Sequence, residues 1–294
     1  MLKSSNAISA AAAGTVALGD LTVNRLGYGA MRITGKGIWG PPADPEAAKA
    51  TLRRAIELGV DFIDTADSYG PDVSEELIAE ALAPYPKGLV IATKGGWQRV
   101  GPGQWIHNAT PNHLEGALEG SLKRLRLERI DVYQLHIPDP AVSFDASMET
   151  LARMREMGRI RHVALSNVTL EHLERARKIV PIVSVQNRYS FADREWDYLL
   201  DHCEKNGIAF IPWAPLGQNR QAHEILDRAA AEVGGTPMQV ALAWLLQRSK
   251  VMLPIPGTSS VEHVEENIVA AGLKLPDRVF RELSEVKPGP AVLR

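Results

Sequence analysis

Residues 59–70 read Gly-Val-Asp-Phe-Ile-Asp-Thr-Ala-Asp-Ser-Tyr-Gly, and this stretch decides the fold and locates the candidate site. A short apolar strand ends at the carboxylate of Asp64, and the phenol of Tyr69 follows five residues later. Later apolar runs end at Lys94 and at His136. Four groups suited to one proton relay therefore lie at corresponding places after successive predicted strands, which indicates an active site.

Apolar, β-branched runs recur along the whole chain and predict eight strands. They end near Gly29, Asp64, Lys94, His136, Ser166, Gln186, Trp213 and Ile255. A helical pattern follows each strand after the first loop, as after Thr110-Pro111, which suit an N-cap and a first helical position. Eight strand–helix units with right-handed crossovers predict an α/β fold, a (β/α)8 TIM barrel. An open doubly wound sheet is the alternative, but no Gly-x-Gly-x-x-Gly follows an early strand and no linker divides the chain.

The two ends of the chain are expected to add to the barrel. We expect a poorly ordered segment over residues 1–14 and one barrel domain over residues 15–294. Residues 15–23 predict a small β-hairpin that caps the bottom of the barrel, with Leu18-Gly19-Asp20-Leu21 at its turn. Extra helices near residues 260–270 and 276–286 should pack outside it.

The composition of the chain excludes several classes of protein and of partner. Of 294 residues, 45% are hydrophobic and 23% are charged, which is typical of a globular chain. The net charge of -2 argues against a general nucleic-acid binder. No window approaches a membrane span, the first residues lack the apolar centre of a secretory signal, and Cys203 alone excludes internal disulfides. We expect a cytoplasmic protein with a small-molecule partner and, because the histidines lack metal-site spacing, no metal.

The strand-end residues suggest a specific chemistry, because strand ends of a barrel converge on one mouth. Asp64 would keep Lys94 charged, and the Lys94 ammonium would lower the pKa of the Tyr69 phenol from its ordinary value near 10. His136 would orient a substrate oxygen, and Tyr69 would act as general acid, worth about 10²–10⁴-fold in rate. Taken singly, each residue has a bland role as a turn cap, a solvated lysine, a buried histidine or a packing aromatic. Their joint placement favours catalysis, and this chemistry needs a hydride donor.

The same residues resemble a known family. The Asp-Thr-Ala-x-x-Tyr-Gly stretch at Asp64, the strand end Ala92-Thr93-Lys94 and the pair Leu135-His136 resemble the catalytic set of the aldo-keto reductase superfamily, and the resemblance covers nearly the whole chain. It implies reduction of an aldehyde or ketone to an alcohol with a nicotinamide cofactor held without a Rossmann fold. It also implies the cofactor contacts: Ser166, Asn167 and Gln186 at the carboxamide, Trp213 stacked on the nicotinamide, Leu216 and Gly217 at the pyrophosphate, and Ile255, Gly257, Thr258, Ser259, His263, Glu266 and Asn267 at the adenosine end.

One departure from the family pattern concerns the choice of cofactor. Where many relatives carry a lysine and an arginine for the 2′-phosphate, this chain has Gly257 and His263. The hydroxyls of Thr258 and Ser259 remain available, but a histidine side chain carries little charge at neutral pH. The resemblance favours NADPH, and NADH stays an alternative.

The substrate is less closely defined. Trp39 and Trp97 fall in predicted loops after the first and third strands, where they would line a substrate pocket. Segments 27–31 and 236–248 resemble a bacterial branch that includes pyridoxal reductases, so pyridoxal is the first specific candidate. A nucleotide-binding regulatory subunit with little turnover is the alternative function. A phosphate-binding isomerase barrel would need a strand-end glutamate, and none presents itself. The oligomeric state stays open.

Overall fold

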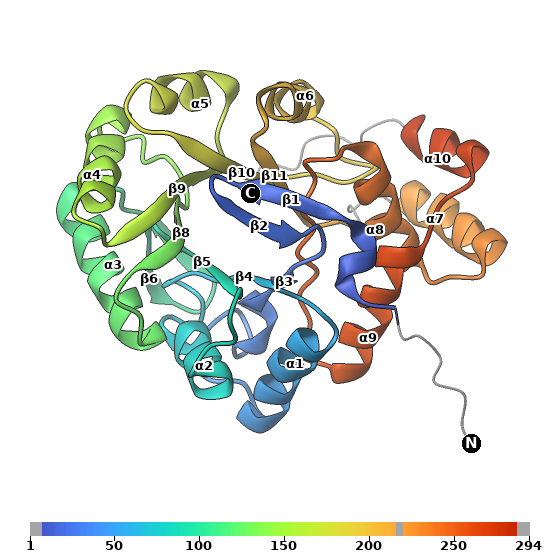
Figure 1. Cartoon of the computed structure of the whole chain (residues 1–294), viewed down its shortest axis with the longest axis horizontal. Coiled ribbons are helices and arrows are strands. Elements are labelled where there is room, and N and C mark those ends of the chain that lie inside the picture. Colours follow the sequence, from blue (N-terminus) through green and yellow to red (C-terminus); the bar gives the residue numbers. More distant parts are fainter. Residues whose placement is uncertain (1–7, 216–219, 287–294) are drawn as a thin grey trace.

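The computed structural model describes residues 8–215 and 220–286 and is built around one curled parallel sheet (Figure 1). Hydrogen-bonded neighbours follow the order β11-β10-β9-β8-β5-β4-β3, and every pair is parallel. These strands are almost wholly buried, as is usual for a parallel sheet covered by helices. They span β3 (Tyr28–Gly29), β4 (Phe62–Asp64), β5 (Val90–Gly95), β8 (Ile130–Leu135), β9 (Ile160–Ser166), β10 (Ile182–Arg188) and β11 (Ala209–Trp213).

The predicted eighth strand closes the sheet into a barrel, although it makes no regular ladder. Backbone hydrogen bonds of 2.8 Å join Phe210 N to Val251 O and Leu253 N to Phe210 O, on the β11 side. On the β3 side, Gly27 N donates to Pro254 O at 2.9 Å. Proline has no amide hydrogen, so Pro254 and the following Pro256 interrupt the pairing without opening the ring. The predicted barrel is confirmed.

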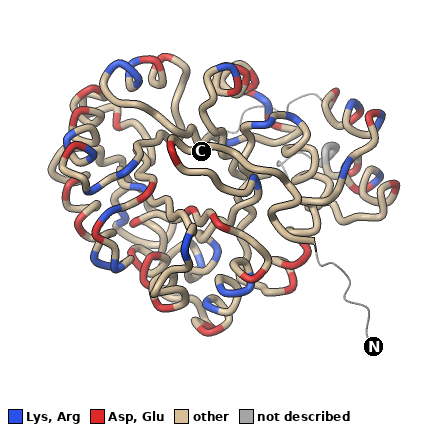
Figure 2. Tube along the Cα trace, in the orientation of Figure 1, with Lys and Arg blue, Asp and Glu red and all other residues tan. Residues whose placement is uncertain are grey.

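Helices surround the strands (Figure 1), and their outer faces carry lysine, arginine, aspartate and glutamate interspersed (Figure 2). The predicted cap of α3 forms, since Thr110 Oγ1 accepts from His113 N with Pro111 in the first turn. Buried leucines on one face of α3 then pack toward the sheet. The helices are α1 (Pro45–Glu57), α2 (Val73–Leu82), α3 (Pro111–Leu125), α4 (Phe144–Glu156), α5 (Leu170–Arg177), α6 (Asp197–Asn206), α7 (Arg220–Val233), α8 (Pro237–Arg248), α9 (Val261–Val269) and α10 (Asp277–Ser284), with short 3-10 turns η1 (Ala10–Ala13), η2 (Ala30–Ile33) and η3 (Ala270–Gly272).

A β-hairpin covers the amino-terminal end of the barrel, as predicted. It consists of β1 (Thr15–Leu18) and β2 (Leu21–Asn24) and lies across the ring of strands in Figure 1. Leu18 and Val23 are buried and join the apolar cluster inside the barrel. Burying a side chain of this size contributes about 1.5–3 kcal/mol, so the hairpin both plugs the barrel and stabilises it.

Two features differ from the expectations. The poorly ordered segment expected over residues 1–14 does not extend to its end, because η1 is formed and Ala10 is buried, with Ala10 N donating to Leu58 O at 2.9 Å. A second hairpin, β6 (Trp97–Gly101) paired with β7 (Gln104–His107), stands between β5 and α3 and was not predicted.

The sole cysteine, Cys203 on α6, is fully buried. Within the described ranges, no helix combines the length and the apolar character needed to cross a membrane.

Candidate active site

Asp64 and Lys94 form a buried ion pair at the carboxyl ends of β4 and β5. The Lys94 Nζ lies 2.5 Å from Asp64 Oδ1 and also donates to Thr65 O at 2.8 Å and to Tyr69 Oη at 3.4 Å. Lys94 is 0% exposed and Asp64 is 2% exposed. Because β4 and β5 are adjacent parallel strands, their ends bring the two side chains to one edge of the sheet.

His136 follows β8 and completes the predicted group of four. Its ring lies 5.8 Å from the Tyr69 ring in an edge-on arrangement, and its Nδ1 is 3.4 Å from Ser68 Oγ. Tyr69, His136 and Lys94 are all buried. The structure therefore brings together all four side chains that the sequence singled out, at the end of the barrel opposite the β1–β2 hairpin.

The burial of this group sets its protonation states. Burial raises the pKa of Tyr69 above its usual value, although Lys94 acts in the opposite direction, so the net lowering expected from the sequence is wrong for this structure. Burial opposes the charge of Lys94, but attraction to Asp64 and Tyr69 outweighs it and the pKa of Lys94 is raised. Burial and the nearby Lys94 charge hold the pKa of His136 well below its usual value. At neutral pH, Lys94 is charged, Tyr69 carries its proton and His136 is neutral.

Two glutamine amides support Asp64 from the remaining side. Gln134 Nε2 on β8 and Gln186 Nε2 on β10 both donate to Asp64 Oδ2, at 2.7 and 2.8 Å. Gln186 is predicted to hold a carboxamide, and in this structure its amide nitrogen donates to Asp64. Gln134 was missed by the sequence analysis. Its signal was a lone amide inside the apolar strand β8, two residues before His136.

The residues predicted to meet the nicotinamide lie at the same barrel mouth. Asn167, directly after β9, donates from Nδ2 to His136 O and to Ser166 Oγ, both at 3.0 Å. It has a positive φ of 56°, a backbone conformation that asparagine tolerates better than most residues. Trp213 ends β11 with 38% of its surface exposed. An exposed indole there fits a stacking partner for a flat ring, while Leu216 and Gly217 lie outside the described residues.

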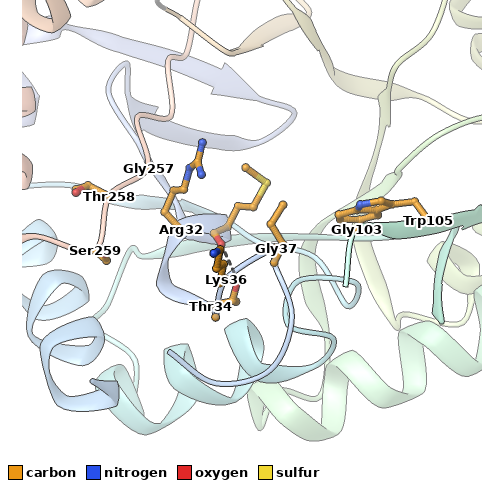
Figure 3. Close-up of a pocket in the computed structure, with 12 residues that line it drawn as sticks. Arg32, Thr34, Lys36, Gly37, Gly103, Trp105, Gly257, Thr258 and Ser259 are labelled. Carbon is orange, nitrogen blue, oxygen red and sulfur yellow. Dashed lines mark hydrogen bonds between the residues drawn. The ribbon is translucent and has the colours of Figure 1, made fainter. Parts of the chain in front are cut away.

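A pocket of about 640 Å³ lies between η2 with its following loop, the turn of the β6–β7 hairpin and the 257–259 segment (Figure 3). Gly257, Thr258 and Ser259, for which contacts to the adenosine end are predicted, form one wall, and Arg32 and Lys36 come from η2 and its following loop. None of the four catalytic candidates lines this pocket. The remaining adenosine candidates lie along the same segment: Ile255 packs on the inner apolar cluster, His263 Nδ1 is 3.4 Å from Thr258 Oγ1, Glu266 O accepts from Gln239, and Asn267 is buried.

The β6–β7 hairpin ties the predicted substrate tryptophans to the catalytic loop. The Trp97 ring lies 6.3 Å from the His136 ring. Arg99 donates from Nη1 to Ile38 O and to Ser68 O, each at 2.8 Å, and its Cζ stands 5.5 Å from the Trp39 ring. Arg99 was missed because its role depends on a hairpin that the sequence pattern did not predict.

Comparison with known proteins places these features in a family. The model of the Aldo/keto reductase family matches residues 25–288. The chain belongs to the aldo/keto reductase family. It is 50% identical over 283 residues to the uncharacterized oxidoreductase C215.11c of Schizosaccharomyces pombe, covering 96% of this chain and 92% of the relative. It is 45% identical over 279 residues to pyridoxine 4-dehydrogenase of Escherichia coli, covering 92% of this chain and 98% of the relative.

Solved structures agree with this assignment. An aldo/keto reductase from Klebsiella pneumoniae, in complex with NADPH, superposes with a TM-score of 0.79 at 27% identity, covering 94% of this chain and 95% of that one. The present chain, as a member of this family, is an oxidoreductase. The Klebsiella structures that contain NADPH or NADP support an NADP-type cofactor. Within the part of the chain that the structure describes, no three histidine, cysteine, aspartate or glutamate side chains gather in a way that would hold a metal ion.

Proposed function

We propose that this aldo/keto reductase uses NADPH to reduce an aldehyde or ketone to an alcohol, with Tyr69 as the general acid and pyridoxal as the first candidate substrate. The observation that carries the proposal is the 3.4 Å contact between the charged Lys94 Nζ and the protonated Tyr69 Oη. A buried phenol that keeps its proton until a nearby ammonium can stabilise the phenolate is suited to deliver that proton on demand.

Each of the four residues has a distinct task. Bound NADPH would supply the hydride to the carbonyl carbon. Tyr69 donates its proton to the carbonyl oxygen as negative charge develops there, and Lys94 stabilises the phenolate that remains. Neutral His136 donates a hydrogen bond that orients the same oxygen. Asp64 holds Lys94 in position and keeps it charged.

Residues on either side of this group would hold the cofactor. Ser166, Asn167 and Trp213 surround the mouth near His136 and suit the nicotinamide end. The amide nitrogen of Gln186 donates to Asp64, so its carbonyl oxygen remains to accept a hydrogen bond from the carboxamide of the cofactor. The 257–259 wall of the pocket suits the adenosine end.

The substrate end is proposed to be aromatic. Trp97 stands edge-on to His136, and Arg99 links it to the loop that carries Trp39. Flat walls of this kind favour a planar ring that carries an aldehyde. The 45% identity to a pyridoxine 4-dehydrogenase supports pyridoxal as that ring.

Steady-state reduction tests the proposal. We would follow the loss of absorbance at 340 nm with NADPH, and separately with NADH, for pyridoxal, glyceraldehyde, methylglyoxal and nitrobenzaldehyde. Saturable reduction of pyridoxal is expected, with NADPH preferred. Activity on nitrobenzaldehyde alone would keep the carbonyl reductase and reject pyridoxal. Tight cofactor binding without turnover on any aldehyde would reject the enzyme in favour of a nucleotide-binding regulatory subunit.

A further inference from the structure

The 257–259 wall of the pocket packs closely against β3 where two glycines, Gly29 and Gly257, meet. A Cβ built on Gly257 would lie 2.5 Å from Gly29 O, and one built on Gly29 would lie 2.6 Å from Ile255 O. Both distances are shorter than a carbon and a carbonyl oxygen can tolerate, so neither position accepts a side chain without movement of the backbone. This contact leaves no room for the side chain of a lysine or an arginine at position 257.

The 257–260 loop is fixed by contacts to β3. Buried Tyr28 donates from its hydroxyl to Thr258 O at 2.5 Å, and Gly29 N donates to Pro256 O at 3.4 Å. Ser260 N in turn donates to Thr258 Oγ1 at 3.1 Å. The pocket wall that contains Thr258 and Ser259 is therefore held by hydrogen bonds to β3, the strand that η2 directly follows.

The positive charge of the pocket comes from η2 and the loop that follows it. The Cγ of Arg32 lies 3.6 Å from the place where a Cβ of Gly257 would stand, and Arg32 extends beside Gly257 and Thr258 in Figure 3. Lys36 lines the same pocket from the following loop. Between the two cations, Thr34 Oγ1 donates a hydrogen bond to Met31 O at 2.9 Å and stabilises the turn.

Both cations lack a counter-charge. Within the described residues, neither Arg32 nor Lys36 forms an ion pair, and none of the twelve residues that line the pocket carries a carboxylate. Arginines elsewhere on the surface, such as Arg159 and Arg161, reach carboxylates at 2.6 and 2.7 Å. Two unpaired cations that line one pocket together with the hydroxyl-bearing Thr258 and Ser259 form an environment suited to a phosphate group.

We propose that Arg32, assisted by Lys36, binds the 2′-phosphate of NADPH. The inference rests on the proposed use of NADPH, and it assigns the charge of the phosphate site to η2 and its loop. Arg32 supplies a planar pair of N–H donors, Lys36 adds a second positive charge, and Thr258 and Ser259 donate from their hydroxyls. Arg32 is a determinant of cofactor preference and takes no part in proton transfer.

Direct binding tests this assignment without relying on turnover. We would measure Kd for NADPH and for NADH by quenching of tryptophan fluorescence in the wild-type protein and in Arg32→Gln. A hydrogen-bonded charge contact to phosphate predicts that NADPH binds roughly ten- to hundredfold more weakly to the variant while the Kd for NADH is unchanged. Lys36→Gln should show the same pattern with a smaller loss. Arg53→Gln, an exposed arginine on α1 away from the pocket, is the matched control and should leave both constants unchanged.

Adenosine 2′,5′-bisphosphate and adenosine 5′-monophosphate separate the phosphate subsites. Arg32→Gln should weaken the bisphosphate and leave the monophosphate unaffected. Equal losses for NADPH and NADH would place Arg32 at the pyrophosphate and overturn the assignment, as would unchanged binding of both. If the wild-type protein binds NADPH and reduces aldehydes, and Arg32→Gln binds NADPH with the same Kd, only this inference is overturned. A wild-type protein that binds neither nucleotide would overturn the proposed function itself.

Discussion

Gln134 donates from its side-chain amide to Oδ2 of Asp64 across 2.7 Å, inside the barrel and out of contact with solvent. The other carboxylate oxygen accepts from Lys94. Together with Gln186, which donates to the same oxygen, this amide fixes the rotation of the carboxylate that holds the ammonium beside Tyr69, and Gln134 acts as a positioning residue.

Replacing Gln134 with leucine, which is similar in size, should remove this bond while keeping the packing. Loss of a hydrogen bond to a charged group costs about 1.5–3 kcal/mol, so we expect kcat to fall by roughly tenfold or more with little change in the Kd for NADPH. Steady-state rates and fluorescence titration measure the two effects. The control is Gln247→Leu on α8, which removes a hydrogen bond from a side-chain amide to Leu275 O, away from the barrel mouth. An equal effect of both variants on kcat would reject the positioning role.

Substituting Tyr69 with phenylalanine should remove the proton donor while preserving the ring that lies edge-on to His136. We expect the single-turnover rate of carbonyl reduction to fall by about 10²–10⁴-fold, with NADPH binding within a factor of about two, since no cofactor contact is assigned to this hydroxyl. Stopped-flow absorbance at 340 nm follows the chemical step. A wild-type rate in this variant would remove Tyr69 from its assigned role.

The pH profile of kcat should reflect the raised pKa of Tyr69 and the lowered pKa of His136. Reduction requires a protonated Tyr69, and burial raises its pKa above the ordinary value, so activity should be retained across neutral pH and lost only as the pH rises through that raised pKa. His136 is neutral well below pH 6.5 because burial and Lys94 lower its pKa. We expect no inflection near pH 6.5 in a profile measured from pH 5 to 11. An inflection there that disappears in His136→Asn would contradict a neutral His136.

Asp67, inside the catalytic loop, should make folding depend on pH. Burial, together with the nearby Glu75, raises the pKa of Asp67 well above its usual value. The folded state therefore holds this proton more tightly than the unfolded chain, and the stability that this provides at low pH falls as the pH rises toward the folded pKa. Asp67→Asn should raise the free energy of unfolding at pH 7, by about 1–3 kcal/mol for a buried polar group, and change it little near pH 4.

Urea denaturation at both pH values measures this difference. Asp227→Asn, on the exposed side of α7, serves as the control, for which no pH-dependent gain is expected. A destabilisation of Asp67→Asn that is the same at pH 4 and pH 7 would show that the carboxylate is needed for a packing or hydrogen-bonding reason unrelated to its proton.

The sequence was sufficient for the barrel and for the four strand-end residues because both follow from local patterns. Apolar runs mark the strands, and each of Asp64, Lys94 and His136 stands where such a run ends. The eighth strand was located correctly, but its prolines, Pro254 and Pro256, determine that it pairs irregularly.

What the sequence missed depends on contacts between distant parts of the chain. Gln186 and Gln134 turn toward Asp64 only because β10, β8 and β4 face one another across the barrel interior. Arg32 meets Gly257 only because the barrel closes between its first and last strands. The pKa of Tyr69 is set by how completely the assembled loops exclude water, so counting the charges beside it gave the wrong sign.

The burial of Cys203 has a practical consequence for work on this protein. Burial raises the pKa of its thiol to about 12, so almost none of it is thiolate at neutral pH and maleimide reagents will not label it. A cysteine introduced at Gln104, exposed between the pocket residues Gly103 and Trp105, would then react alone in an otherwise native background. A fluorophore placed there would report on nucleotide arrival in real time, without first removing any thiol from the chain.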